Sequence, residues 1–535
     1  MSGINAVYSA DRKFTGNDVI EWTSSAEVQE QPRGEAGAGV AMADQWGEIK
    51  IETNMGPVRI AIPLETLLKV GNPSVYVVAG HTRYAREENP SIINTQPIKI
   101  ETERYATAVA ADSKLVGWNE INTWFEYNPK RTMTGAEVFG RVFLDELERT
   151  NGNIRDAGEK FFYRMDGKGF YSVVMLVKEK DKNDVRLVAI RDPYSGLPFC
   201  CAKRDETYFF SSGTYPMEHE GINLRDIKEV PRASVTVISE NGIDTNVYEQ
   251  YKKPIRTCVF ERVYFGSPYD RVLTELGPKF YELYDKYHKL LTANPEFKET
   301  PSNYMIRAVL GACWAERHRE LANEVDKAIP IVYTGTGVTH GISRVLGLPE
   351  EHDALFKTYA PRTFQISDKE LRKMEVDLKN AGFAEFIKSF RILTGDDSIV
   401  KGGVGGYYSK KRGVLGLFER LGATSLLMAI SYSPMPYPCI RGFAPYHLRE
   451  RMAAEGMAHL PEETQEKLVG EKMGTGLKIP FSVGYQRKQD TYDIFGPHHC
   501  FACMDGNYPV DVKYVPDWIR SQKDIADTLA NIRWV

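Results

Sequence analysis

The sequence predicts an α/β protein with two main domains, and three observations support this prediction. The chain has 535 residues, a length that usually folds as two or more domains. Short β-type runs separated by turns dominate residues 48–250. Beyond them, helical stretches alternate with single strands, as in a doubly wound parallel sheet. We therefore expect a domain boundary near residue 254.

In the first half, the expected elements are mainly strands. Residues 24–48 are polar and rich in Gly and Ala, which predicts a loop. One helix is predicted at 135–150, because apolar residues recur there at three- and four-residue spacing. The strands of this half are predicted at 75–80, 171–177, 185–190 and 233–239.

In the second half, single strands are separated by helical segments. Ligands of such parallel sheets bind beyond the carboxyl ends of the strands. The strands are predicted at 328–333, 390–394 and 425–432, and the helices at 268–292, 303–324 and 367–390.

The composition excludes several classes of function. The net charge is -4, so the chain as a whole does not have the positive electrostatic field that attracts polyanions. We therefore expect no nucleic-acid partner. The N-terminus has no apolar signal region, and no apolar run approaches membrane-spanning length. We expect a soluble cytoplasmic protein with no membrane partner. Seven cysteines in so large a chain do not suggest a disulfide framework and leave metal binding open.

The most informative stretch is residues 392–403, Ile-Leu-Thr-Gly-Asp-Asp-Ser-Ile-Val-Lys-Gly-Gly. A β-type run ends there in two acids, Asp396 and Asp397, and opens into a Gly-rich turn with one cation. The acids can accept hydrogen bonds from both hydroxyls of a ribose, and the turn can direct backbone N–H groups at a phosphate. The alternative interpretation is a turn with two solvated acids.

A series of motifs resembles the amidophosphoribosyltransferase family, whose members make the first purine intermediate from phosphoribosyl pyrophosphate (PRPP) and glutamine. This resemblance implies an α/β fold: an N-terminal-nucleophile (Ntn) αββα layer domain at 1–254 and a type I phosphoribosyltransferase domain at 255–455. A helical tail at 456–535 would carry two cysteines of a metal site. The motifs follow the family's order: GHTRYA at 80–85, NTQPI at 94–98, RDPYSGLP at 191–198, CVFERVYFGSP at 258–268, DDSIVKG at 396–402, SPMPYPC at 433–439 and CFACMDGNYPVD at 500–511.

For the transferase half, the resemblance implies a PRPP site with Mg²⁺. Asp396 and Asp397 would hold the ribose hydroxyls, and Lys357 and Arg362 would cover the diphosphate. Gly403 and Val404 stand where the family has two Thr, and Lys401 replaces an Arg. The remaining expected substrate-binding residues are Ser398, Lys401, Gly402, Gly403, Thr334, Thr336 and Arg307, the last equally well interpreted as a surface helix arginine. Residues 332–337 stand where the family has its pyrophosphate loop, and we expect a polar, Gly-rich turn there.

In the glutaminase half the resemblance breaks down. Ser2 replaces the family's nucleophilic Cys. Asp112 and Ser113 replace the Asn and Gly that donate to the oxyanion, and an ionised Asp can only accept. Gly135 replaces the Asp that holds the amino group of glutamine. Arg83 is retained and can still fork a carboxylate. We therefore expect a retained scaffold with an inactive, or repurposed, amide site.

Four cysteines match the ligands of the family's iron–sulfur branch. They are Cys258, Cys439, Cys500 and Cys503, and four thiolates are the usual ligand set of a [4Fe–4S] cluster. A four-cysteine zinc site is the alternative.

The leading functional hypothesis is transfer of ammonia or another amine to C1 of PRPP, in purine or related nucleotide metabolism. We expect a homo-oligomer, either a dimer or a tetramer. One alternative is a non-catalytic paralogue that binds PRPP or a nucleotide as a regulatory or scaffold subunit. A further alternative is a full glutamine-dependent enzyme that works through Ser2.

Overall fold

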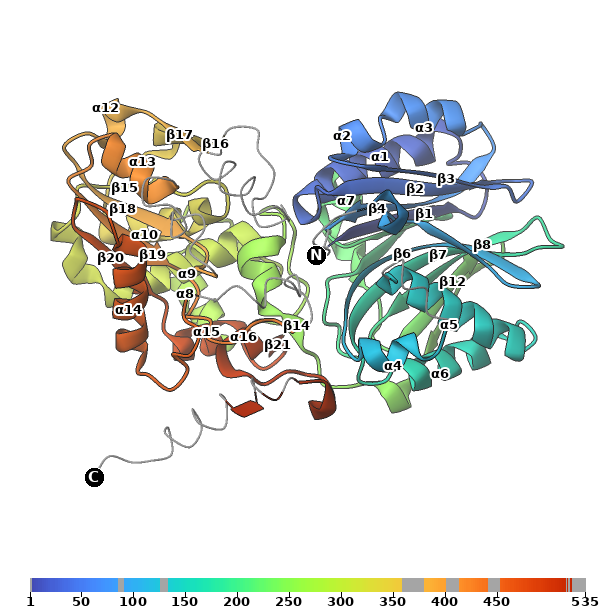
Figure 1. The fold of residues 1–535 in the computed structure, drawn as a ribbon. Helices are drawn as coiled ribbons and strands as arrows, with labels where there is room; N and C mark the ends of the chain where they lie inside the picture. The colour runs from blue at the N-terminus through green and yellow to red at the C-terminus, as the bar shows by residue number, and fades with distance from the viewer. Residues whose placement is uncertain are drawn as a thin grey trace. The chain divides into compact units, whose positions relative to one another are not determined.

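The computed structural model describes residues 2–84, 91–125, 133–357, 380–400, 413–440, 453–515, 517, 520 and 521 (Figure 1). These residues form two compact units. Unit 1 contains the described residues up to Thr257, together with Ile440 and 509–514, and unit 2 contains the others. The separate C-terminal tail expected from residue 456 stays a prediction.

Unit 1 is built on two antiparallel sheets that are stacked face to face (Figure 1). The strands of the first sheet, in spatial order, are β11 (Lys228–Glu229), β9 (Cys200–Arg204), β10 (Thr207–Ser211), β1 (Gly3–Ser9), β4 (Val75–Arg83), β2 (Gly37–Asp44) and β3 (Ile49–Met55). Those of the second are β13 (Gly242–Val247), β12 (Ser234–Ser239), β8 (Val185–Arg191), β7 (Gly169–Glu179), β6 (Tyr105–Leu115) and β5 (Ile98–Glu101).

Helices cover the outer faces of both sheets, which gives four layers (Figure 1). Both faces of the second sheet are buried, and successive residues of a strand point to opposite faces. In β6, Ala108 and Ala110 face the first sheet, whereas Val109 and Ala111 face the helices. The helices on the first sheet are α1 (Asn17–Glu30), α2 (Val58–Ala61), α3 (Leu64–Val70) and α7 (Tyr215–His219), and those on the second are α4 (Trp118–Asn122), α5 (Gly135–Arg149) and α6 (Ile154–Met165).

Unit 2 is built on a four-stranded parallel sheet. Helices pack on both faces, because successive residues of its strands point to opposite sides: Ile392 lies in one apolar cluster and Leu393 in the other. The strands, in spatial order, are β15 (Lys327–Pro330), β18 (Arg391–Asp396), β19 (Ser425–Ile430) and β20 (Phe481–Tyr485). The helices are α8 (Pro278–Tyr287), α9 (Asn303–Arg317), α10 (Thr334–Leu346), α12 (Ala384–Ile387), α13 (Val414–Arg420), α14 (Glu462–Gly474), α15 (Lys488–Phe495) and α16 (Ala502–Asp505).

Two small two-stranded sheets complete unit 2. One joins β16 (Leu355–Lys357) to β17 (Asn380–Gly382). The other joins β14 (Thr257–Cys258) to β21 (His499–Cys500) and thereby brings two of the four matching cysteines into one element pair.

The loop predicted at 24–48 is wrong. Helix α1 continues to Glu30, and β2 occupies residues 37–44, with all eight of its residues buried. The stretch is rich in Gly and Ala because β2 lies between two strands beneath other layers, where small side chains fit. Several of its polar residues, among them Glu27, Glu30, Arg33 and Asp44, are buried rather than solvated.

Three element predictions in the second half are wrong at their ends. The helix predicted at 268–292 is confined to α8, which starts at Pro278 after Gly277. The strand predicted at 328–333 ends at Pro330, and α10 begins four residues later. The helix predicted at 367–390 begins outside the described residues, and its later part contains the strand β17.

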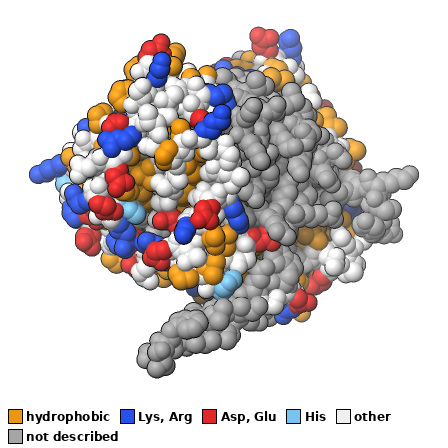
Figure 2. Space-filling view, turned by 60° about the vertical axis from the view of Figure 1, so that its left-hand side comes forward, with side chains coloured by type: hydrophobic (Ala, Val, Ile, Leu, Met, Phe, Trp, Pro, Cys, Tyr) orange, Lys and Arg blue, Asp and Glu red, His pale blue; other side chains and the backbone are white. Residues whose placement is uncertain are grey.

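The face drawn in Figure 2 shows Lys and Arg side chains interspersed with Asp and Glu, so its described part carries no large field of one sign. Among the described residues, no helix combines the length and the apolar character needed to cross a membrane.

Candidate functional site

The Asp pair lies at the carboxyl end of the parallel sheet. Asp396 is the last residue of β18, and both Asp396 and Asp397 are buried, at 6% and 2% exposure. The backbone N–H of Asp397 donates to Asp396 Oδ1 (2.9 Å), and the Ser398 hydroxyl donates to Asp397 Oδ1 (2.5 Å). The Ser431 hydroxyl donates to the Asp397 carbonyl oxygen (3.4 Å). These contacts fix the pair where ligands of parallel sheets bind.

The first turn of α10 packs directly against this pair. A Cβ at Gly335 would overlap the carbonyl oxygen of Gly395 and would lie 3.2 Å from Asp396 Cα, so only glycine permits this approach. Thr334 and Thr336 flank Gly335 in the same turn. The positive end of the helix dipole and two hydroxyls therefore lie beside the carboxylates, in a place suited to an anionic ligand.

Lys357 approaches the same helix from β16. Its Nζ lies 5.1 Å from the ring centre of Tyr333, the residue that precedes α10 and is 64% exposed. Lys357 is therefore near the turn with Thr334 and Thr336, as its expected role requires. Arg362, Lys401, Gly402, Gly403 and Val404 lie outside the described residues.

Arg307 is placed differently from the other expected substrate-binding residues. It is 1% exposed, and its guanidinium donates to the carbonyl oxygens of Arg262 (3.2 Å) and Gly266 (2.8 Å). The alternative of a surface helix arginine is therefore wrong, because Arg307 is buried. Since its guanidinium bonds to backbone carbonyl oxygens, we do not include Arg307 in the proposed site.

In unit 1, Ser2 and Asp112 lie together. The backbone N–H of Ser2 donates to Asp112 Oδ1 (3.1 Å), and the backbone N–H of Tyr84 donates to the Ser2 hydroxyl oxygen (3.2 Å). Arg33, which is fully buried, donates to the Ser2 carbonyl oxygen (3.1 Å) and lies 3.5 Å from Asp112 Oδ2. The Asp112 carboxylate is thus held as an acceptor beside Ser2, where an amide-cleaving site would need a donor.

Arg83 makes hydrogen bonds within the protein. Its Nη1 donates to the Ser91 carbonyl oxygen (2.6 Å) and to the Thr95 hydroxyl oxygen (2.9 Å). The side chain is 3% exposed. A glutamine carboxylate would have to displace or share these contacts.

Ser113 and Gly135 face one another across β6 and the first turn of α5. A Cβ at Gly135 would overlap Ser113 Oγ and would lie 3.2 Å from Ser113 Cβ. The hydroxyl therefore occupies the space into which a side chain at position 135 would extend.

The four matching cysteines converge in unit 2. Burial raises the pKa of the Cys503 thiol well above its usual value, and the charges of Cys258, Cys500 and Cys439 raise it further. The Tyr432 hydroxyl and Cys503 Sγ are 3.2 Å apart. Four cysteines grouped in one place, with the Cys503 thiol desolvated by burial, form a suitable set for a thiolate-binding metal centre.

The spacing of the four sulfur atoms is wider than that of a compact metal site. Among the described residues, the set of His, Cys, Asp and Glu ligand atoms that all lie within 4.8 Å of one another is His340, Glu350 and His352, and it includes no cysteine. A tetrahedral zinc–thiolate site with Zn–S bonds of about 2.3 Å separates its sulfurs by only about 3.8 Å.

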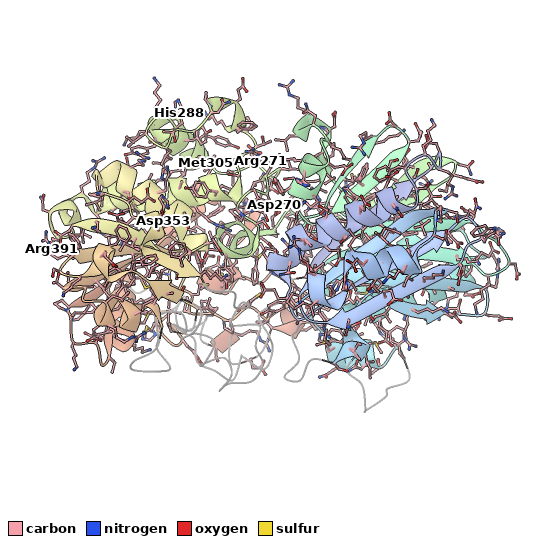
Figure 3. All side chains as sticks on the ribbon, turned by 90° about the horizontal axis from the view of Figure 1, so that it is seen from above. Asp270, Arg271, His288, Met305, Asp353 and Arg391 are labelled. Carbon is pink, nitrogen blue, oxygen red and sulfur yellow. The ribbon has the colours of Figure 1, made fainter. Side chains whose placement is uncertain are left out.

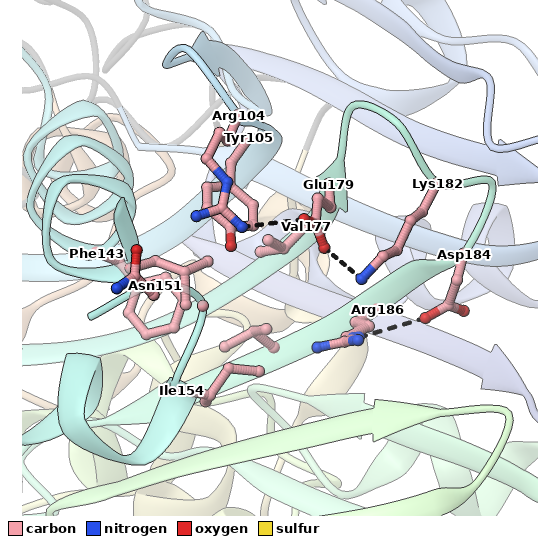
Figure 4. A pocket seen from close by; sticks show the side chains of 13 residues that line it. Arg104, Tyr105, Phe143, Asn151, Ile154, Val177, Glu179, Lys182, Asp184 and Arg186 are labelled. Carbon is pink, nitrogen blue, oxygen red and sulfur yellow. Dashed lines mark hydrogen bonds and ion pairs between the residues drawn. The ribbon is translucent and has the colours of Figure 1, made fainter. Parts of the chain in front are cut away.

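A pocket of about 180 Å³ in unit 1 is a poor candidate for a ligand site (Figure 4). It lies at the Tyr105 end of β6, about 23 Å along the strand from Asp112 at the usual rise per residue. The charges that line it are paired, since Glu179 lies 3.2 Å from Arg104 and 2.6 Å from Lys182. Its volume is also below the roughly 300 Å³ of the smallest typical ligand pockets.

Proteins with this arrangement of domains are found among the relatives of the chain. No model of a known protein family matches it. The chain is 24% identical over 530 residues to "Amidophosphoribosyltransferase" of Methanocaldococcus jannaschii, covering 96% of this chain and 98% of that protein. It is 26% identical over 483 residues to the protein of the same name from Pyrococcus horikoshii, covering 90% and 91%. Over nearly its whole length the chain is therefore similar to members of the amidophosphoribosyltransferase family.

Solved structures of amidophosphoribosyltransferase relatives have the same fold. The glutamine phosphoribosylpyrophosphate amidotransferase of B. subtilis, solved with ADP and GMP, superposes with a TM-score of 0.69 at 18% identity and covers 95% of this chain. A structure described as the allosteric regulatory enzyme of purine biosynthesis gives a TM-score of 0.70 at 17% identity, with 96% covered. The predicted fold class is therefore confirmed: an Ntn-type αββα layer domain followed by a type I phosphoribosyltransferase domain.

Two residues near these sites were missed by the sequence reasoning. Arg33 lies in the stretch that was interpreted as a loop, and a buried arginine there gives no local signal. Tyr333 precedes the predicted diphosphate-binding turn, and its exposure beside Lys357 becomes evident only in the folded chain.

Proposed function

We propose that this chain transfers a nitrogen nucleophile, ammonia or another amine, to C1 of the ribose of PRPP. The bond between C1 and the pyrophosphate oxygen breaks, a C1–N bond forms, and pyrophosphate leaves with the electron pair. The nucleophile loses one proton to solvent. The observation that carries this proposal is the buried pair Asp396 and Asp397, held against the first turn of α10.

Each group has a role in this reaction. Asp396 and Asp397 would accept hydrogen bonds from the ribose hydroxyls, and their charge would stabilise the oxocarbenium-like transition state. Thr334, Thr336 and the positive end of α10 would bind the diphosphate together with Mg²⁺. Lys357 would add a cation on the same side. Ser398 would contact the 5′-phosphate, together with the turn at 401–403.

The geometry of unit 1 supports a nitrogen source other than glutamine. Asp112 accepts a hydrogen bond from Ser2 and pairs with Arg33, so an acceptor stands at the position where the family's motif has an oxyanion donor. Ser113 fills the space beside Gly135, where the family places the carboxylate that binds the glutamine amino group. We expect glutamine hydrolysis not to exceed the rate without enzyme.

We further propose that Cys258, Cys439, Cys500 and Cys503 bind a [4Fe–4S] cluster. The grouping of Cys258, Cys439 and Cys500 near the Cys503 thiol supports a common ligand. Because none of the described groups of ligand atoms within 4.8 Å contains a cysteine, a cluster of four irons fits better than a single zinc ion. The cluster has no step in the reaction, and its role would be to hold α16 and β21 on unit 2. Zinc remains the alternative.

The relatives support a place in purine or related nucleotide synthesis. The expected cytoplasmic location and the homo-oligomer stay predictions.

The decisive experiment measures PRPP binding and pyrophosphate release. With Mg²⁺ and ammonium present, the protein should bind PRPP and release pyrophosphate. Asp397→Asn should weaken PRPP binding about 10- to 100-fold, because a charge-assisted pair of hydrogen bonds contributes about 1.5–3 kcal/mol.

The matched control is Asp326→Asn, which lies just before the neighbouring parallel strand β15, at the opposite edge of the sheet from Asp396. Asp326 pairs with Arg391, the first residue of β18, at 2.7 Å. That variant should bind PRPP like the wild type. Equal binding by the Asp397 variant would contradict the proposed site. Binding without pyrophosphate release for any amine would instead favour a regulatory subunit.

A further inference from the structure

Three side chains with metal-ligand chemistry meet at the edge of the parallel sheet in unit 2. His340 lies in α10, Glu350 follows that helix, and His352 belongs to a 3-10 turn at His352–Ala354. The backbone fixes this segment, because Glu350 forms a parallel bridge with Ala328 of the edge strand β15. The Glu351 N–H donates to the Ala328 carbonyl oxygen (2.9 Å).

The carboxylate of Glu350 lies between the two imidazoles. His340 Nδ1 is 3.2 Å from Glu350 Oε2, and His352 Nε2 is 3.2 Å from Glu350 Oε1. One ligand atom from each of the three residues lies within 4.8 Å of the other two. The side chains of His340 and Glu350 are 12% and 10% exposed, whereas that of His352 is 47% exposed. Two ligands are thus held firmly, and the third faces solvent.

We propose that His340, Glu350 and His352 bind a divalent transition-metal ion, with zinc as the best fit. Zinc accepts imidazole nitrogen and carboxylate oxygen at about 2.0–2.2 Å, and tetrahedral ligands at that distance are separated by about 3.4 Å. Each imidazole nitrogen lies 3.2 Å from one carboxylate oxygen of Glu350, close to one such edge, and the two nitrogens approach different oxygens. With one oxygen as ligand, all three ligand atoms lie within 4.8 Å of one another. Three protein ligands leave the fourth position for water or another ligand.

A hydrogen-bonded His–Glu–His chain without metal is the competing explanation. The local negative charge favours a bound cation, because Glu350 is followed by Glu351 and Asp353. Lys327, which lies 3.2 Å from Glu351, offsets part of that negative charge. The chemistry also separates this site from the other metals proposed. Hard Mg²⁺ prefers oxygen ligands and would travel with PRPP, whereas the cysteine set is all sulfur.

The position of the site gives it a mechanical consequence. His340 lies two turns along the helix whose first turn contacts Asp396, and His352 lies five residues before Lys357 in β16. A bound metal would cross-link α10 to the segment that carries Lys357. If the proposed function is correct, occupancy of this site would restrict how Lys357 moves toward the diphosphate.

The test uses the full-length protein, purified without a polyhistidine tag and with its cysteine site intact. Zn²⁺ binding is measured by equilibrium dialysis, and the ligands are identified by X-ray absorption. A site of nitrogen and oxygen ligands gives distances of about 2.0–2.1 Å, whereas thiolates give about 2.3 Å. We expect one zinc per chain in the nitrogen and oxygen class.

His352→Ala should weaken this binding by at least about 100-fold, since even the partners of metal ligands contribute 10- to 100-fold. His352 is half exposed, so the variant should fold, and Glu350→Gln provides a second variant. The control is His288→Ala at the end of α8. Figure 3 shows His288 well apart from Asp353, the neighbour of His352.

Zinc found only on sulfur, or zinc bound equally tightly by wild type, His352→Ala and Glu350→Gln, would overturn the proposal. Neither outcome depends on PRPP turnover. The metal site can therefore fail while the transferase proposal holds, and the reverse.

Discussion

Ser113 and Gly135 illustrate how two single residues can close a site together. Ser113 is 8% exposed, and its hydroxyl fills the volume beside the first residue of α5. The family has Gly at the position of Ser113 and Asp at the position of Gly135. In this chain the larger of the two side chains is therefore on β6 instead of α5. Because the two positions are in contact, changes at them should not be additive.

We expect Gly135→Asp alone to lower the free energy of unfolding by about 1–3 kcal/mol, the usual cost of overpacking. In a Ser113→Gly background the same change should cost much less, because the obstructing hydroxyl and Cβ are gone. Urea unfolding of the two single variants and the double variant measures this. Additive effects would mean that the two side chains do not compete for the same space.

His81 gives unit 1 a pH-dependent stability. Burial, reinforced by the nearby Arg83 cation, lowers the pKa of His81 to about 3. In the unfolded chain the pKa of His81 is about 6.5. Below that pH the unfolded state therefore binds a proton on His81, whereas the folded state does not. Stability should therefore fall as the pH drops from about 6.5 toward 3, by about 1.4 kcal/mol per pH unit from this residue.

The measurement compares unfolding at pH 7 and pH 5.5 for wild type and His81→Gln. The variant should lose less stability on acidification, even if it starts from a lower value. His219→Gln, an exposed histidine in the same unit, should behave like the wild type. An unchanged pH slope for His81→Gln would show that the imidazole is already protonated in the folded protein.

For single residues, the sequence predicted the site residues that are neighbours within one short motif. It did not predict contacts between residues that are distant in the chain. Asp396, Asp397 and Ser398 are neighbours in the chain, and their hydrogen bonds follow from that proximity. The contact between Ser113 and Gly135 joins two residues that are 22 positions apart in the chain, and no single motif contains both.

Among the elements, the junction of α10 with β18 is the most closely fitted part of the proposed PRPP site. Gly335 of the helix lies against the backbone of Gly395, and this contact sets the distance between Thr334 and the carboxylates. The pattern of the sequence predicted a Gly-rich turn here, because two glycines and two threonines are poor helix formers. The structure has a helix, since the glycines are needed for close packing.

Gly335→Ala should both destabilise unit 2 and weaken PRPP binding, because the new Cβ would push the helix away from Asp396. Gly341→Ala is the matched control. It lies in the same helix, and its Cβ would overlap the carbonyl oxygen of Ala308 in α9 instead. The control should lose comparable stability but retain more of its PRPP affinity. Titration calorimetry and thermal unfolding separate the two effects.

For the whole molecule, the fold class was predictable because its signals are repeated along the chain. Strands with alternating patterns and helices with three- and four-residue spacing recur many times, so single errors do not change the class. The loop assigned to residues 24–48 shows the limit of this reasoning. A strand of Gly, Ala and Val with both faces buried has no alternation to detect.

The cysteine site links segments that are distant in sequence. Anaerobically purified protein should be brown and contain four irons per chain. Cys503→Ser should remove the colour and lower stability by several kcal/mol, on the order of a structural metal's contribution. Cys201→Ser, in unit 1, should leave the iron content unchanged. Colourless wild-type protein with stoichiometric zinc would contradict the cluster.

The register of β1 has a consequence for how the chain is made. This strand is synthesised well before β10, yet it is central in its sheet, and Ser9 pairs with Thr207 of β10. At 5–20 residues per second, about 10–40 s pass between the synthesis of these partners. During that interval an apolar strand has one edge with no native neighbour, which is a template for wrong pairing. The nascent chain should therefore depend on holding chaperones until residue 211 has emerged, and the dependence should be strongest when translation is slow.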